Sequence, residues 1–152
     1  VACAMEAAIK DIPGVAVSTV FPNETDLPMD EVLSMTARIG RHVAENVLVH
    51  GLPYHTLLNV NVPAVAESDL KGIHITRMGG RHYESDELTA RHDPSGRPYY
   101  WLGGGKRIDL PDNGSDVGAI LNGYVSVAPL SLDMTAYSFV DALTDWGLKI
   151  ED

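Results

Sequence analysis

The sequence has little of what several classes of protein require. Its single cysteine, Cys3, cannot form a disulfide within the chain, and such a composition fits a reducing cytoplasm best. No apolar run approaches the roughly 18 residues of a membrane-spanning helix. Basic residues are scarce, since 11 Lys and Arg stand against 21 Asp and Glu, and the formal net charge of −10 repels polyanions. We therefore expect neither a membrane nor an extended nucleic acid as a partner.

The common catalytic and metal-binding motifs are also missing. There is no G-x-S-x-G elbow, no cysteine pair for zinc, and no H-E-x-x-H among the six histidines. An acidic loop at 108–116 fails as a calcium loop, because Pro111 stands at its third position and Ile120 at its twelfth. Cys3 lies in a segment predicted to be a helix packed on a sheet, so we interpret it as an inert small hydrophobe.

What is present indicates one globular α/β domain. The chain has 152 residues, of which 45% are hydrophobic, with a mean hydropathy of −0.03. Residues 1–10 favour a helix, and Val15–Val20 is typical of a buried strand in a parallel sheet. Nothing ahead of Val1 can cap that helix. We therefore expect the first part of an α/β protein to precede this sequence.

A covering helix and a strand follow. Apolar residues recur on one helical stripe from Pro28 to about His50, where Gly51 and Pro53 predict its end. Thr56–Pro63 alternates as a strand, with two asparagines, Asn59 and Asn61, on the face opposite its valines. These asparagines are either ligand contacts or, as the more ordinary interpretation, polar residues satisfied at an exposed face or sheet edge.

Residues 71–105 predict a projecting β-hairpin arm. Its first limb alternates through Ile73, Ile75 and Met78, and its second carries the aromatic residues Tyr99, Tyr100 and Trp101. Between them, Asp93-Pro94-Ser95-Gly96 has the composition of a type I turn. A projecting two-stranded ribbon leaves unpaired edges, so we expect it to bind a second copy of the chain.

Four arginines crowd this arm, and they meet either phosphate or neighbouring carboxylates, with carboxylate pairing the favoured interpretation. They are Arg77, Arg81, Arg91 and Arg97.

The last part of the sequence predicts a short helix, a strand and a terminal helix, in that order. Ser115 or Asp116 caps a short helix that ends at Gly123, and Tyr124–Leu130 follows as a strand. Residues 131–152 form a hinge, which contains Asp133, and a terminal helix capped by Thr135. The apolar face of that helix consists of Tyr137, Val140, Leu143 and Trp146. This face must pack on the same chain or on a neighbouring subunit.

The order of these segments resembles the carboxyl-terminal part of the SurE family, the survival-protein family of 5′/3′-nucleotidases. The similarity covers essentially all residues 1–152. It rests on VACAMEAAIKDIPGVAVS at the start, LNVNVP at 58–63, Thr76-Arg77, Tyr99-Tyr100-Trp101, and GYVSV at 123–127 followed by Pro129-Leu130. The resemblance implies a Rossmann-like, three-layer α/β sandwich whose arm and terminal helix assemble a homodimer or homotetramer.

The resemblance also implies an activity. Intact family members are Mg²⁺- or Mn²⁺-dependent phosphomonoesterases that hydrolyse nucleoside 5′(3′)-monophosphates to nucleoside and phosphate, with short polyphosphate as an additional substrate. Their metal ligands, an aspartate pair, a serine and an asparagine, precede the equivalent of Val1, so no catalytic or metal-binding residue carries over to this chain. The alternative is a catalytically incomplete module that provides assembly contacts and a wall of the cleft.

Overall fold

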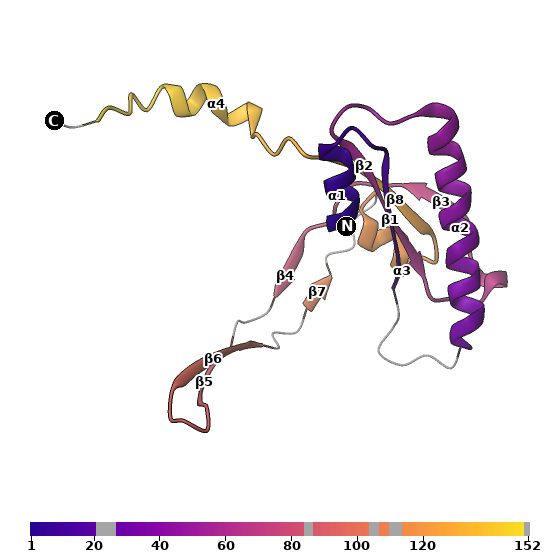
Figure 1. Cartoon of the computed structure of the whole chain (residues 1–152), viewed down its shortest axis with the longest axis horizontal. Helices are drawn as coiled ribbons and strands as arrows, with labels where there is room; N and C mark the ends of the chain where they lie inside the picture. The colour runs from indigo at the N-terminus through magenta and orange to yellow at the C-terminus, as the bar shows by residue number, and fades with distance from the viewer. Residues whose placement is uncertain (21–26, 84–86, 104–106, 110–113, 151–152) are drawn as a thin grey trace.

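The computed structural model describes residues 1–20, 27–83, 87–103, 107–109 and 114–150. Its centre is a four-stranded sheet with the spatial order β1-β2-β8-β3. The strands are β1 (Gly14–Val20), β2 (Thr56–Pro63), β8 (Val125–Ser131) and β3 (Ile73–Ile75). β1 and β2 are parallel, β8 runs antiparallel to β2, and β3 is parallel to β8. Helices cover both faces, so the predicted three-layer α/β architecture is confirmed (Figure 1).

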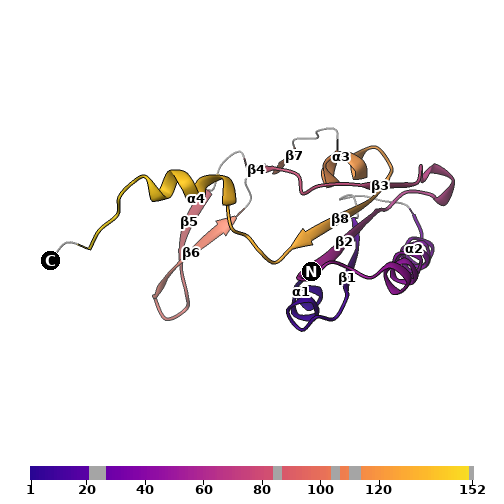
Figure 2. The same cartoon turned by 90° about the horizontal axis from the view of Figure 1, so that it is seen from above.

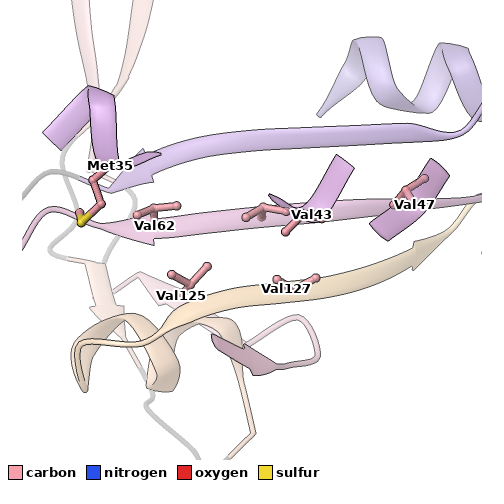
Figure 3. Close-up of a cluster of buried hydrophobic side chains, with 7 residues drawn as sticks. Met35, Val43, Val47, Val62, Val125 and Val127 are labelled. Atoms are coloured by element: carbon pink, nitrogen blue, oxygen red, sulfur yellow. The ribbon is translucent and has the colours of Figure 1, made fainter. Parts of the chain in front are cut away.

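The larger core lies between the sheet and α2 (Met29–His50). Met35, Val43 and Val47 of this helix point toward the valines of β2 and β8 (Figure 3). Those valines are almost completely buried. Because alternate residues of a strand point to the same face of a sheet, the valines of each strand all face α2. The helix ends at Gly51, whose φ of 72° lies in the left-handed region that glycine tolerates. The predicted bounds of this amphipathic helix are therefore confirmed, although its N-cap residue is Pro28 and no side chain caps its start.

The opposite face of the sheet carries α1 (Ala2–Ile9), which packs Ala4 and Ala8 against Leu57. α1 lies so close to β1 that a Cβ atom at Gly14 would come within 2.4 Å of the carbonyl oxygen of Ala4. The helix that carries Cys3 packs on the sheet as predicted, but the Cys3 side chain is exposed, so it is not one of the packed hydrophobic residues. Each helical residue turns about 100° from the last, so with Ala4 facing the sheet Cys3 faces away.

β2 has the bounds predicted from its alternation, but it is an interior strand, with β1 on one side and β8 on the other. The interpretation of Asn59 and Asn61 as residues of a sheet edge is therefore wrong. Alternation shows that one face of a strand is apolar, but it does not show how many neighbours the strand has.

The arm differs in part from its prediction. The strands that meet at the Asp93 turn are β5 (Glu87–His92) and β6 (Pro98–Gly103), and β4 (Arg81–Tyr83) pairs with β7 (Arg107–Asp109) nearer the sheet. Ile73–Ile75 is not a limb of the arm, because it pairs with β8 in the central sheet. The β5–β6 hairpin projects from the body of the molecule, as expected (Figure 1).

After β8 the chain leaves the body altogether. Two short elements that precede β8, a 3-10 turn at Glu67–Asp69 and α3 (Asp116–Leu121), lie against the domain. By contrast, α4 (Tyr137–Thr144), which follows β8, extends away from it (Figures 1 and 2). Every residue from 133 to 150 is exposed. None of the described helices combines the length and the apolar character needed to cross a membrane.

Candidate functional site

The hinge between β8 and α4 is organised by one carboxylate. Oδ1 of Asp133 accepts a hydrogen bond from the backbone N–H of Thr135 at 2.9 Å, and Oδ2 accepts one from the hydroxyl of Tyr137. The backbone N–H of Asp133 itself donates to Oγ of Ser131 at 3.1 Å. These three bonds give the segment a defined path although it is fully exposed.

The same contacts shift two acid–base equilibria. Hydrogen bonds from the side chain of Thr135, then from Tyr137 and from the Thr135 backbone, lower the pKa of Asp133 to about 2. In return, the hydrogen bond to Asp133, followed by the negative charge of that carboxylate, raises the pKa of the Tyr137 phenol.

Thr135 does not cap α4, contrary to the prediction. Ala136 holds the N-cap position without a side-chain bond, and the Thr135 carbonyl accepts a hydrogen bond from the N–H of Tyr137. Asp133, two residues earlier, takes the polar role through an Asx-type turn, which competes with a Thr cap for the same segment.

The apolar face of the terminal segment has no cover among the described residues. Tyr137, Val140, Leu143 and Trp146 are all exposed, with Tyr137 at 69% and Trp146 at 63%. Trp146 lies beyond the end of the helix and contacts Phe139 edge to face, with ring centroids 5.7 Å apart. Phe139 was not among the residues predicted for the apolar face, but this contact with Trp146 makes it part of the same apolar surface. The predicted apolar face is therefore present, and the described part of the chain leaves it exposed.

The arm presents a second uncovered apolar surface. Tyr99, Tyr100 and Trp101 lie in β6, and Tyr100 and Trp101 are 63% and 64% exposed. At the tip, Oδ1 of Asp93 accepts from the N–H groups of Ser95 at 2.8 Å and of Arg97 at 2.9 Å, and Arg97 returns an ion pair to Oδ2. The predicted turn and one of the predicted arginine–carboxylate pairs are thus confirmed.

A clamp that sequence reasoning did not find fixes the root of the arm. Oδ1 of Asp116 accepts hydrogen bonds from the N–H of Gly79 at 2.7 Å and of Val117 at 2.8 Å. Oγ of Ser115 accepts one from Gly118, so Ser115 is the N-cap of α3. Asp116 therefore joins the start of α3 to the loop that leads into the arm.

Two cavities lined by described residues lie at opposite edges of the sheet. One of about 320 Å³ lies beyond the carboxyl ends of β1 and β2, lined in part by Asp30, Glu31 and an ion pair of 2.6 Å between Arg38 and Glu67. The other, of about 270 Å³, lies where β1 and β2 begin and includes the stacked rings of Tyr54 and His55, whose centroids are 3.7 Å apart. Ligands of open α/β sheets bind beyond the carboxyl ends of the strands, which favours the first edge for chemistry.

The part of the chain that the structure describes contains no cluster of metal-ligating side chains. Within the ranges that the structure describes, no three His, Cys, Asp or Glu residues lie close enough to hold a metal ion. The Mg²⁺ or Mn²⁺ ion that the family resemblance implies is expected to bind outside this sequence, and the described residues offer no alternative site for it.

Comparison with known proteins gives one consistent result. The family model described as survival protein SurE matches residues 1–85. A 5′-nucleotidase SurE of Chloroflexus aggregans is 38% identical over 146 residues, and that of Symbiobacterium thermophilum is 41% identical over 148 residues. These alignments cover 96% and 97% of this chain, but only 56% and 55% of the relatives.

The fold comparison agrees. The crystal structure of the SurE protein from Aquifex aeolicus matches with a TM-score of 0.70 and 34% sequence identity, covering 97% of this chain and 56% of that one. The chain thus spans about half the length of the relatives that it matches.

Proposed function

Because this chain belongs to the SurE family, we propose that the intact protein is a phosphomonoesterase that hydrolyses nucleoside 5′-monophosphates to nucleoside and phosphate. The observation that carries the proposal is the 38% identity to a protein named 5′-nucleotidase SurE over 96% of this chain. We extend the proposal to nucleoside 3′-monophosphates, which the family resemblance implies.

The proposal includes a divalent cation, Mg²⁺ or Mn²⁺, held by residues outside this sequence. Such an ion supplies positive charge to the phosphoryl oxygens as negative charge develops there. What this chain contributes, in the proposal, is the sheet edge at the carboxyl ends of β1 and β2, which forms one wall of the substrate cleft.

A second function, assembly of a homodimer or homotetramer, is supported by a separate observation. The arm and α4 both project from the body, and both expose aromatic side chains that soluble proteins usually cover. A second copy of the chain is the simplest partner for two such surfaces.

Activity of the purified intact protein tests the first proposal. We expect release of phosphate from AMP in Mg²⁺ or Mn²⁺ and its loss on chelation. A polypeptide of only residues 1–152 should release no phosphate from AMP or p-nitrophenyl phosphate above background. Metal-dependent turnover that co-purifies with the mass of the 152-residue chain would contradict the placement of the metal site outside it.

A further inference from the structure

A row of polar side chains crosses the central sheet near the carboxyl ends of β1 and β2. Ser18 of β1 is paired directly with Asn61 of β2, Asn61 with Ser126 of β8, and Ser126 with His74 of β3. Directly paired residues of neighbouring strands point to the same face. These four residues, named here the polar row, therefore share the face of the sheet that lies away from α2.

The two halves of the polar row differ in their partners. On the β8 side, Ser126 is completely buried and its hydroxyl bonds that of Thr76 at 2.8 Å, while His74 stacks on Tyr124 with ring centroids 3.8 Å apart. On the β1 side, Ser18 is exposed and Asn61 only half-buried. No side-chain hydrogen bond reaches the Asn61 amide from any residue that the structure describes. Among the described residues, this half of the row therefore has hydrogen-bonding groups without a side-chain partner.

Asn59, which precedes Asn61 on β2, adds a second side chain with a hydrogen-bonding atom that is unpaired among the described residues. It lies two residues earlier on the same face, and its Oδ1 is buried without a donor in the described part of the chain. Its direct partners across the sheet are Ala16 and Ala128, which have no side-chain donor to offer. Buried amide oxygens nearly always have a partner in folded proteins, so this atom indicates a donor that comes from outside the described residues.

The chemistry of these groups selects a class of ligand. An asparagine amide both donates and accepts hydrogen bonds, as a serine hydroxyl does, and neither carries a charge. Phosphate is recognised mainly by arginine, lysine or metal ions, whereas ribose hydroxyls and the edges of bases match neutral amides. The position also fits, since ligands of α/β sheets bind at the carboxyl ends of parallel strands.

We propose that Asn61, with Ser18 beside it and Asn59 behind it, binds the uncharged nucleoside part of the substrate. This inference rests on the nucleotidase function proposed above. It assigns to β1 and β2 the recognition of the nucleoside, separately from the binding of the phosphoryl group.

Kinetics of the intact protein on two substrates test the proposal. Asn61→Leu keeps the approximate size of the side chain and removes its hydrogen bonds. We expect KM for AMP to rise about tenfold with kcat unchanged, as loss of one or two neutral hydrogen bonds predicts. Constants for p-nitrophenyl phosphate, which has no nucleoside, should stay within about twofold. Ser18→Ala, at a position that is exposed in this chain, should show the same selectivity with a smaller effect.

Asn46→Leu is the matched control, because Asn46 is exposed on α2 and its amide serves only the carbonyl of His42 among described groups. Unchanged KM for AMP in Asn61→Leu, or an equal loss on both substrates, would overturn the inference. Calorimetry with adenosine separates this result from failure of the proposed function. A wild-type protein that hydrolyses neither ester removes the nucleotidase proposal, yet weaker adenosine binding by Asn61→Leu would still support the nucleoside site. Equal adenosine binding by both forms would overturn that site.

Discussion

The hydroxyl of Tyr137 donates a hydrogen bond to Oδ2 of Asp133, across the point where the chain turns from β8 into α4. Both residues are exposed, so neither is held by packing within the body of the chain. The direction in which α4 leaves the domain is therefore set by local hydrogen bonds rather than by a core.

The first prediction concerns the ionisation of Tyr137. Asp133→Asn keeps the shape of the side chain and removes the charge that stabilises the phenolic proton, so the pKa of Tyr137 should fall toward its ordinary value of 10.0. NMR titration of tyrosine labelled with ¹³C measures this, and Tyr137→Phe identifies the signal. Identical titration of Tyr137 in the wild type and in Asp133→Asn would show that the bond does not form in solution.

The second prediction is the pH dependence of the hinge. The pKa of Asp133 is lowered from 3.8 to about 2. The hydrogen bonds of its carboxylate therefore stabilise the hinge fully above pH 3.8, and this stabilisation is lost as the pH falls through about 2. The amide shifts of Thr135 and Tyr137 should therefore stay constant from neutral pH to about pH 4 and change mainly below pH 3. A transition centred between pH 4 and pH 5 would count against the lowered pKa.

A third prediction concerns the aromatic residues of the arm. Replacement of Tyr99 and Trp101 by Ala should shift the intact protein to a smaller oligomer, since aromatic anchors at the centre of an interface commonly contribute about 2 kcal/mol or more. Because Trp101 is 64% exposed in its own chain, the double variant should remain folded and soluble. Light scattering measures the mass, and Tyr54→Ala is a control at an exposed tyrosine outside the arm. A double variant with the wild-type mass would exclude these side chains from the assembly interface.

The fourth prediction concerns α4. Deletion of residues 137–152 removes no residue of the two hydrophobic cores, one between the sheet and α2 and the other between the sheet and α1. The sheet and its helices should therefore remain folded, as circular dichroism can measure. If the exposed face of α4 packs on a second subunit, the deletion variant should be monomeric, or should aggregate through the surface that α4 normally covers. A deletion variant that remains a stable, soluble dimer would show that the arm alone holds the assembly.

A fifth prediction tests the clamp at the root of the arm. A Cβ atom at Gly79 would lie 2.8 Å from Oδ1 of Asp116, so Gly79→Ala should destabilise the protein by about 1–3 kcal/mol in urea unfolding. Gly80→Ala is the matched control, because a Cβ at that position would meet nothing within 4 Å. In the background of Asp116→Ala, which removes the crowded oxygen, the cost of Gly79→Ala should shrink. Equal costs in both backgrounds would show that Asp116 and Gly79 are not coupled.

Local patterns predicted local structure well. The apolar stripe of α2, the turn at Asp93 and the cap at Ser115 each depend on residues within a few positions of one another, and the structure confirms all three. The resemblance to the SurE family likewise predicted the layers of the fold.

Partners across the sheet were not predictable in the same way. The alternation of Ile73 and Ile75 identified a strand but not its neighbour, which is Val125–Val127 rather than the second limb of the arm. The polar row depends on three pairings between strands far apart in sequence, so the sequence alone indicated only that Asn59 and Asn61 share one face of β2. The clamp between Asp116 and Gly79 joins residues 37 positions apart, and no local signal marks it.

The antiparallel direction of β8 has a consequence for how an assembled protein would meet its substrate. Ser131, at the end of β8, lies opposite Thr56, at the beginning of β2, so the chain departs toward α4 from the edge farthest from the carboxyl ends of β1 and β2. A second subunit that bound α4 would therefore contact the chain from the edge of the sheet opposite the proposed substrate cleft. Contacts made through α4 alone would then leave the carboxyl ends of β1 and β2 uncovered, so the proposed assembly surface on α4 and the proposed substrate cleft could change independently.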